Sequence, residues 1–217
     1  LSDPTTKVVS TNSANTQMVK RVGNKIAAAV TQYMNANGFG DQIKNYKWEF
    51  NLIESKEINA WCMPGGKVAI YTGILPVTKD EAGLATVMGH EVAHAIAQHS
   101  AERASQMQLA QVGGAAVGVA SSNSKYADYI NAAYGIGGQL TILKYGRNQE
   151  LEADKMGLYL MAMAGYDPQA SIGFWERMSA TGGQAPPEIL STHPSDETRI
   201  ASLKEFMPEA LKYYKKP

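Results

Sequence analysis

The sequence predicts a mainly helical α+β fold with one small antiparallel β-sheet. Three observations support this fold class. Apolar residues recur at helical spacing over most of the chain, two short β-prone runs flank a Pro-Gly-Gly turn near residue 65, and the apolar stretch around residue 90 contains no helix breaker except Gly89. With 217 residues, of which 44% are hydrophobic and 18% charged, the chain is long enough to bury a core.

The first half of the chain is predicted to contain one helix followed by a strand. Residues 1–13 are polar and lack periodicity, so we expect a loosely held arm before a single domain over residues 14–217. Apolar side chains at helical spacing predict a helix over residues 14–37, which Gly38 ends. Residues 46–52 alternate between apolar and polar, which indicates a half-buried strand.

A hairpin and a long helix are expected next. Residues 58–62 and 67–71 are β-prone and flank the turn at residues 63–66, which predicts an antiparallel hairpin. The sequence TKDE at residues 78–81 has the spacing of a capping box and predicts the start of the helix that carries residues 90–94.

The second half of the chain is predicted to be helical. The expected helices are residues 101–120, 126–145, 147–164, 169–180 and 194–207. The most apolar stretch, residues 112–120, is far shorter than the roughly 20 residues of a bilayer span, so no transmembrane segment is predicted. Residues 1–6 carry no secretory signal; this start is typical of a cut inside a longer precursor and leaves room for a lipid anchor before Leu1.

Composition excludes some classes of function. The 20 basic and 20 acidic residues cancel, so bulk charge favours neither nucleic acid nor a membrane surface as a partner. Cys62 is the single cysteine, which rules out an internal disulfide and a cysteine-based zinc cluster.

Residues 90–94, with the sequence HEVAH, are the strongest chemical signal. His90 and His94 are four residues apart, so on a helix both imidazoles lie on one face and can bind one metal ion. Glu91 lies about 100° around the helix, within reach of a metal-bound water. A bare HExxH pattern also arises by chance as two surface histidines beside a glutamate. The apolar neighbours indicate instead a buried helix, where ionisable groups need partners.

A third ligand is expected from the sequence RNQELEAD at residues 147–154. Glu150 and Asp154 share a helix face, so Glu150 can bind a metal while Asp154 accepts a hydrogen bond from a ligand histidine. The alternative is that acidic residues in a first helical turn stabilise the helix dipole.

Two further polar residues are candidates near the C-terminus. His193, held before a helix by a proline, can donate to an oxyanion, with a capping or surface histidine as the alternative. Arg199 can orient a carboxylate or the substrate backbone. His99 lies about 140° off the face of His94 and is interpreted as a helix-end cation rather than a ligand.

Four stretches together resemble a known family. They are residues 59–66 (NAWCMPGG), 81–94 (EAGLATVMGHEVAH), 147–157 (RNQELEADKMG) and 192–200 (THPSDETRI). In this order they resemble the HtpX/CaaX-prenyl-protease-like family of zinc metallopeptidases, or gluzincins, and most closely its soluble cell-envelope members of the BepA and LoiP kind. The resemblance covers roughly residues 15–205, and no TPR-like repeats follow.

The resemblance implies a zincin-like metallopeptidase fold and a site. One Zn²⁺ per chain would be held by His90, His94 and Glu150, with Glu91 as the general base that activates the zinc water. Asp154 would accept a hydrogen bond from a ligand histidine, and His193 would lie near the oxyanion. The strand over residues 67–71, with Val68, Ala69 and Ile70 at its centre, would be the sheet edge that receives an extended peptide.

The expected function is zinc-dependent endopeptidase activity on misfolded or envelope proteins in the periplasm or cell envelope of a bacterium. The substrate would be a peptide or unfolded protein, with no nucleic acid involved. The alternative is a latent or weakly proteolytic zinc-binding chaperone, or an assembly factor for envelope proteins, whose groove is covered by residues 101–124 or 213–216. Intact Glu91 favours the enzyme, because a pure binding site needs no general base.

Overall fold

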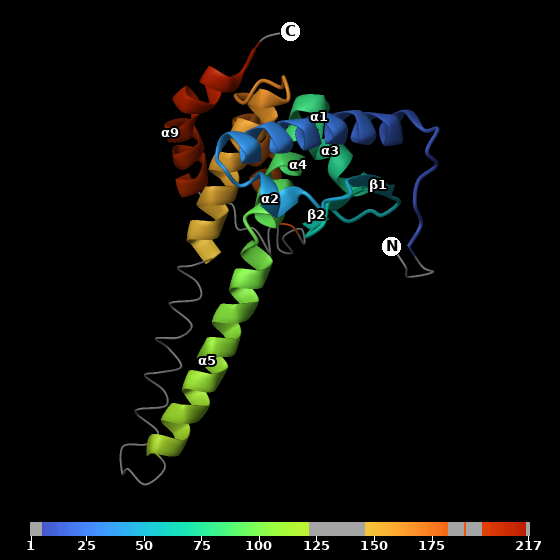
Figure 1. Cartoon of the computed structure of the whole chain (residues 1–217). Coiled ribbons are helices and arrows are strands. Elements are labelled where there is room, and N and C mark those ends of the chain that lie inside the picture. Colours follow the sequence, from blue (N-terminus) through green and yellow to red (C-terminus); the bar gives the residue numbers. More distant parts are fainter. Residues whose placement is uncertain (1–5, 122–145, 182–188, 190–196, 216–217) are drawn as a thin grey trace. The chain divides into compact units, whose positions relative to one another are not determined.

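The computed structural model describes residues 6–121, 146–181, 189 and 197–215 (Figure 1). The described part is mostly helical and contains one three-stranded sheet, which confirms the predicted mainly helical fold class. The chain divides into two compact units, one comprising Leu1–Ala97 with Leu151–Pro217 and the other Gln98–Glu150. A single domain over residues 14–217 stays a prediction.

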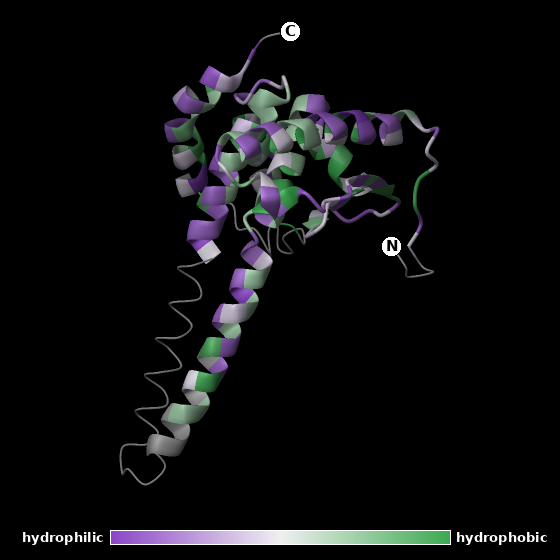
Figure 2. Cartoon of the chain, viewed as in Figure 1, coloured by the Kyte–Doolittle hydropathy of each residue, from purple (hydrophilic) through white to green (hydrophobic). Residues whose placement is uncertain are grey.

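Helix α1 spans Ala14–Ala36, as predicted. It begins where the Ser13 side chain accepts a hydrogen bond from the Thr16 amide, which satisfies one of the unpaired donors at the helix start. One face of the helix is buried and packs against α4 and β1, whereas the other is exposed. Hydrophobic and hydrophilic colours accordingly alternate along α1 in Figure 2. The short helix α2, Gly40–Ile43, follows.

Strand β1 spans Glu49–Ile53 and begins three residues later than the alternation predicted. The preceding segment pairs with the hairpin turn instead, because the Lys47 and Glu49 amides donate to the Gly65 and Gly66 carbonyls. Phe50 and Leu52 are buried as expected.

The described part of the N-terminal arm pairs with β1, and a loosely held arm over residues 1–13 stays a prediction. The Val9 amide donates to the Leu52 carbonyl at 2.8 Å, and the Glu54 amide donates to the Lys7 carbonyl at 2.8 Å. Val8 also forms an antiparallel bridge with Ile53. Outer backbone N–H and C=O groups at the end of β1 hydrogen-bond with this polar segment. The spacing of apolar residues within the segment itself does not indicate such pairing.

The sheet is mixed rather than wholly antiparallel. Strands β2, Ala60–Met63, and β3, Lys67–Tyr71, form the predicted antiparallel hairpin. Its turn uses Gly65 and Gly66 at φ 93° and 95°, which side chains other than glycine rarely adopt. Strand β1 pairs in parallel with β3, so the strand order is β1-β3-β2.

Strand β3 is therefore not the sheet edge that we predicted for Val68, Ala69 and Ile70. It lies in the centre and pairs with β1 on one side and β2 on the other, so its backbone groups are used within the sheet. The edges are β1 and β2, and β2 is the strand that packs against α4.

Helix α4, Glu81–Ile96, is the buried centre of the first unit. The turn η1 (Thr72–Ile74) and the short helix α3 (Leu75–Thr78) precede it. The predicted capping box is wrong in its detail, because Thr78 ends α3 and the N-cap is Asp80, whose carboxylate accepts from the Gly83 amide at 2.8 Å. Every residue from Gly83 to Ile96 is buried, and α4 packs against α1, α3, α7 and β2.

Three helices complete the first unit. The helix described over residues 146–163 begins in the second unit, and α7 spans Ala170–Ala180; both agree with the prediction. Helix α9 spans Glu197–Tyr213 and continues past the predicted end, with Pro208 inside it. Buried Met207 and Ala210 flank this proline, so packing compensates for the hydrogen bond that proline removes.

The second unit contains helix α5, His99–Ser121, which confirms the predicted helix over residues 101–120. The Gln149 side chain donates to the Glu102 carboxylate at 2.7 Å and accepts from Arg103 at 3.3 Å, which ties residues 146–150 to the start of α5. His99 is buried at the first turn of α5, so the prediction of a cation ending the HExxH helix is wrong. The helix predicted over residues 126–145 lies outside the described residues.

None of the described helices has both the length and the hydropathy that crossing a bilayer requires.

Candidate metal centre

His90 and His94 converge on one point from successive turns of α4. Their Nε2 atoms lie 3.1 Å apart and their ring centroids 4.6 Å apart. Both side chains are buried, with exposed fractions of 1% and 7%. Two nitrogens bound to one tetrahedral zinc ion at about 2.0–2.1 Å lie about 3.3–3.4 Å apart, so the observed spacing is close to that of a shared ligand pair.

Two glycines let a second helix approach His90 closely. Gly157, on the helix over residues 146–163, faces Gly89 of α4, and a Cβ atom added at Gly157 would lie 3.0 Å from the His90 amide nitrogen. Backbone atoms cannot yield as a flexible side chain can, so any larger residue would push the two helices apart. This contact brings Asp154, one turn before Gly157, within reach of His90.

Asp154 fixes the orientation of the His90 ring. His90 Nδ1 donates to Asp154 Oδ1 at 2.9 Å, and this assignment leaves Nε2 as the metal-binding nitrogen. Burial raises the pKa of Asp154, but the positive charge of Arg199 and the hydrogen bond from His90 outweigh it, so the pKa lies below its usual value. The carboxylate is therefore ionised when it accepts from His90.

Arg199 of α9 neutralises this buried carboxylate. Its guanidinium donates to Asp154 Oδ1 at 2.5 Å, and its side chain is 4% exposed. Arg199 thus contacts a carboxylate, and its role in orienting a carboxylate or the substrate backbone stays a prediction. The guanidinium also lies over the ring of Trp175, a residue that the sequence analysis did not identify.

Glu150 lies on the same helix as Asp154, one turn earlier, and is half-buried. One nitrogen each of His90 and His94 and a carboxylate oxygen of Glu150 lie within 4.8 Å of one another. The structure thus brings together the three side chains that were predicted as metal ligands. The next residue, Leu151, points away from this face and is 36% exposed.

The donor set fits zinc. Two neutral imidazoles and one carboxylate are the ligands of a catalytic zinc site that keeps its fourth position open. The hydrogen bond from His90 to Asp154 fixes the orientation and tautomer of the His90 ring, as is usual for histidine ligands of a metal ion. Other divalent ions also accept this set of ligands, so the three side chains are compatible with a transition-metal site.

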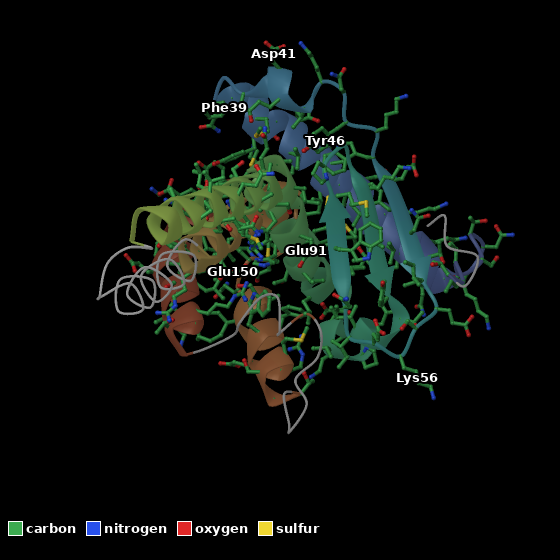
Figure 3. All side chains as sticks on the ribbon, turned by 90° about the horizontal axis from the view of Figure 1, so that it is seen from below. Phe39, Asp41, Tyr46, Lys56, Glu91 and Glu150 are labelled. Carbon is green, nitrogen blue, oxygen red and sulfur yellow. The ribbon has the colours of Figure 1, made fainter. Side chains whose placement is uncertain are left out.

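Glu91 lies beside the metal centre without being part of the ligand cluster. Its side chain is 4% exposed, and Figure 3 shows it on α4 next to the strands of the sheet. Helix α4 packs against the edge strand β2, which carries Cys62. Burial and the negative charge of Glu91 raise the pKa of the Cys62 thiol to about 12. A carboxylate between a metal centre and a sheet edge is placed to exchange a proton with a bound peptide.

His193, the candidate for the oxyanion, lies outside the described residues, so its role stays a prediction.

The chain was compared with known proteins. Residues 14–207 match the model described as peptidase family M48. The chain is 38% identical over 178 residues to the mitochondrial metalloendopeptidase OMA1 of Schizosaccharomyces pombe, which covers 77% of this chain and 49% of that protein. It is 34% identical over 200 residues to the mitochondrial metalloendopeptidase OMA1 of Bos taurus, covering 86% of this chain and 38% of that protein.

A bacterial relative is also similar. The chain is 30% identical over 189 residues to the beta-barrel assembly-enhancing protease of Escherichia coli strain K12, covering 81% of this chain and 38% of that protein. The matches thus span about half of these relatives' lengths or less.

Proposed function

The chain belongs to peptidase family M48, and on this premise we propose that it is a zinc-dependent metalloendopeptidase. The observation that carries the proposal is the buried pair of His90 and His94, whose Nε2 atoms lie 3.1 Å apart with the Glu150 carboxylate close by. A zinc ion with a purely structural role would not need a general base. Glu91, which can act as one, is buried and directly follows His90 in the sequence.

The residues divide the chemistry of peptide hydrolysis among them. His90, His94 and Glu150 would hold the zinc ion, which would supply a Lewis acid for the scissile carbonyl and lower the pKa of a water molecule. Glu91 accepts the proton of the attacking water and delivers it to the leaving amine. His193 donates to the developing oxyanion, the role proposed for it from the family resemblance.

The substrate binds along β2 in this proposal. Strand β2 pairs with β3 on one side and ends the sheet on the other, so its outer backbone groups can pair with an extended peptide. It packs against α4, which carries Glu91, so a peptide added there would run past the metal centre. Strand β2 thereby replaces Val68, Ala69 and Ile70 of β3 as the proposed substrate edge.

Unfolded or misfolded proteins are the proposed substrate class, because strand addition requires an extended segment rather than a particular fold. The cellular compartment of the protein is indicated less directly than its substrate class. The names of the relatives place some in mitochondria, whereas another is a bacterial protease of β-barrel assembly. A location in the bacterial cell envelope, with or without a lipid anchor, therefore stays a prediction.

Removal and return of the metal test the proposal. Casein is digested with the purified protein as prepared, after treatment with a chelator, and after addition of one equivalent of zinc. We expect cleavage to disappear with the metal and to return with zinc, because the proposed site supplies the Lewis acid. Equal cleavage by the metal-free protein would contradict the proposal. Zinc binding without cleavage would favour the zinc-binding assembly factor instead.

A further inference from the structure

Trp175 of α7 contacts both the candidate ligand His90 and its supporting cation. The Arg199 guanidinium carbon lies 3.5 Å from the centre of the Trp175 ring, and the His90 ring meets Trp175 edge-on at 5.3 Å and 73°. These three side chains come from three different helices, α7, α9 and α4. All three are at least nine-tenths buried, with exposed fractions of 1%, 4% and 1% for Trp175, Arg199 and His90.

Trp175 and Asp154 constrain Arg199 in different directions. Asp154 accepts from a terminal nitrogen at the edge of the guanidinium, whereas the indole covers its flat face. Attraction between a cation and an aromatic face is strongest for tryptophan and increases when water is excluded. Arg199 Nη2 also lies 3.1 Å from His90 Nδ1 and 3.3 Å from His90 Nε2. The indole covers the flat face of the planar guanidinium and so fixes its tilt in addition to these contacts at its edge.

Little space remains in which Trp175 can move. It borders a cavity of about 10 Å³, enough for about one water molecule, whose other walls include His90, Asp154 and Ser171. Phe174 packs against it from the preceding position at a centroid distance of 5.0 Å. The indole is therefore a rigid surface against which Arg199 and His90 are both held.

We propose that Trp175 is a positioning residue for the metal ligand His90. It acts by direct edge-on contact with the imidazole and by holding Arg199 against the Asp154 carboxylate that accepts from His90. The inference rests on the proposed function, because the quantity that it concerns is the affinity for zinc. It assigns Trp175 no contact with the substrate and no part in proton transfer.

The test compares zinc affinity among three variants and the wild-type protein. Trp175→Leu removes the aromatic face, Trp175→Phe keeps a smaller one, and Phe50→Leu is the matched control. Phe50 is likewise a buried aromatic residue, but it lies on strand β1 rather than on α7. Zinc dissociation constants are measured by competition with a chromophoric chelator, and the stability of each zinc-free protein by urea denaturation.

We expect Trp175→Leu to weaken zinc binding by about 10- to 100-fold, the range seen when the outer support of a metal ligand is lost. Trp175→Phe should restore part of this affinity. Phe50→Leu should lower the urea midpoint to a similar extent as Trp175→Leu while leaving the zinc affinity unchanged. Loss of affinity in proportion to loss of stability in all three variants would show a merely structural role and overturn the proposal.

The outcome is separable from that of the proposed function. If the wild-type protein binds zinc and Trp175→Leu binds it equally tightly, this inference fails and the metallopeptidase proposal stands. If the wild-type protein binds zinc but neither it nor any variant cleaves casein, the peptidase proposal fails, whereas the affinity comparison still decides the role of Trp175.

Discussion

Replacing Glu91 with glutamine is expected to reduce the turnover number for casein by about a hundredfold to ten-thousandfold, the range for loss of a general acid–base. Glutamine has nearly the same shape as glutamate but cannot accept the proton of the attacking water. Glu91 is buried beside the metal centre and is not among its three proposed ligands, so zinc should remain bound. Digestion rates and zinc content are measured on the same samples.

The control for this substitution is Glu49→Gln, which removes an exposed carboxylate from β1 at the opposite edge of the sheet. This variant should cleave casein at the wild-type rate. Unchanged turnover of Glu91→Gln with zinc bound would show that another group transfers the proton. Loss of zinc together with activity would show that Glu91 contributes to metal binding.

Replacing Asp154 with alanine should produce the largest loss of stability. The substitution leaves the Arg199 guanidinium buried without its carboxylate partner, and breaking a buried ion pair in this way costs about 3–5 kcal/mol. It also removes the acceptor of His90 Nδ1, so zinc affinity should fall by about 10- to 100-fold. The free energy of unfolding of the zinc-free protein, from urea denaturation, separates the first effect from the second.

A surface aspartate provides the comparison. The side chain of Asp41 is 95% exposed, and it pairs with Lys44 at 3.6 Å, so Asp41→Ala should cost about 0–0.5 kcal/mol. An Asp154→Ala variant as stable as Asp41→Ala would mean that the Arg199 charge is compensated elsewhere and that the contacts of Asp154 with His90 and Arg199 do not stabilise the fold.

Local features of the sequence predicted most of the helices and the ligand cluster. A spacing of four residues places His90 beside His94, and Glu150 one turn before Asp154, wherever the helices lie. The helix containing residues 90–94 is apolar on nearly every side, so its burial could also be predicted from the sequence.

The sheet edge was predicted wrongly because strand pairing is not a local property. The hairpin of β2 and β3 follows from its turn, but nothing in residues 46–52 indicates that β1 pairs with β3 in parallel. That pairing places β3 in the centre and moves the proposed substrate edge to β2. Alternation of apolar residues identifies a strand without identifying its neighbours.

Trp175 was missed for a related reason. In the sequence it is one apolar position of an amphipathic helix, which is typical of a core residue. Its contacts with Arg199 and His90 depend on the packing of three helices that are distant along the chain. An arginine predicted to orient a carboxylate was the available signal, because such a cation often lies against an aromatic ring.

The most direct test of the central claim is anomalous X-ray scattering at the zinc absorption edge from crystals of the zinc-loaded protein. The account predicts one zinc ion at bonding distance, about 2.0–2.2 Å, from His90 Nε2, His94 Nε2 and a carboxylate oxygen of Glu150. A zinc ion bound elsewhere, such as at the Cys62 thiol, or no ion at these three side chains would contradict it.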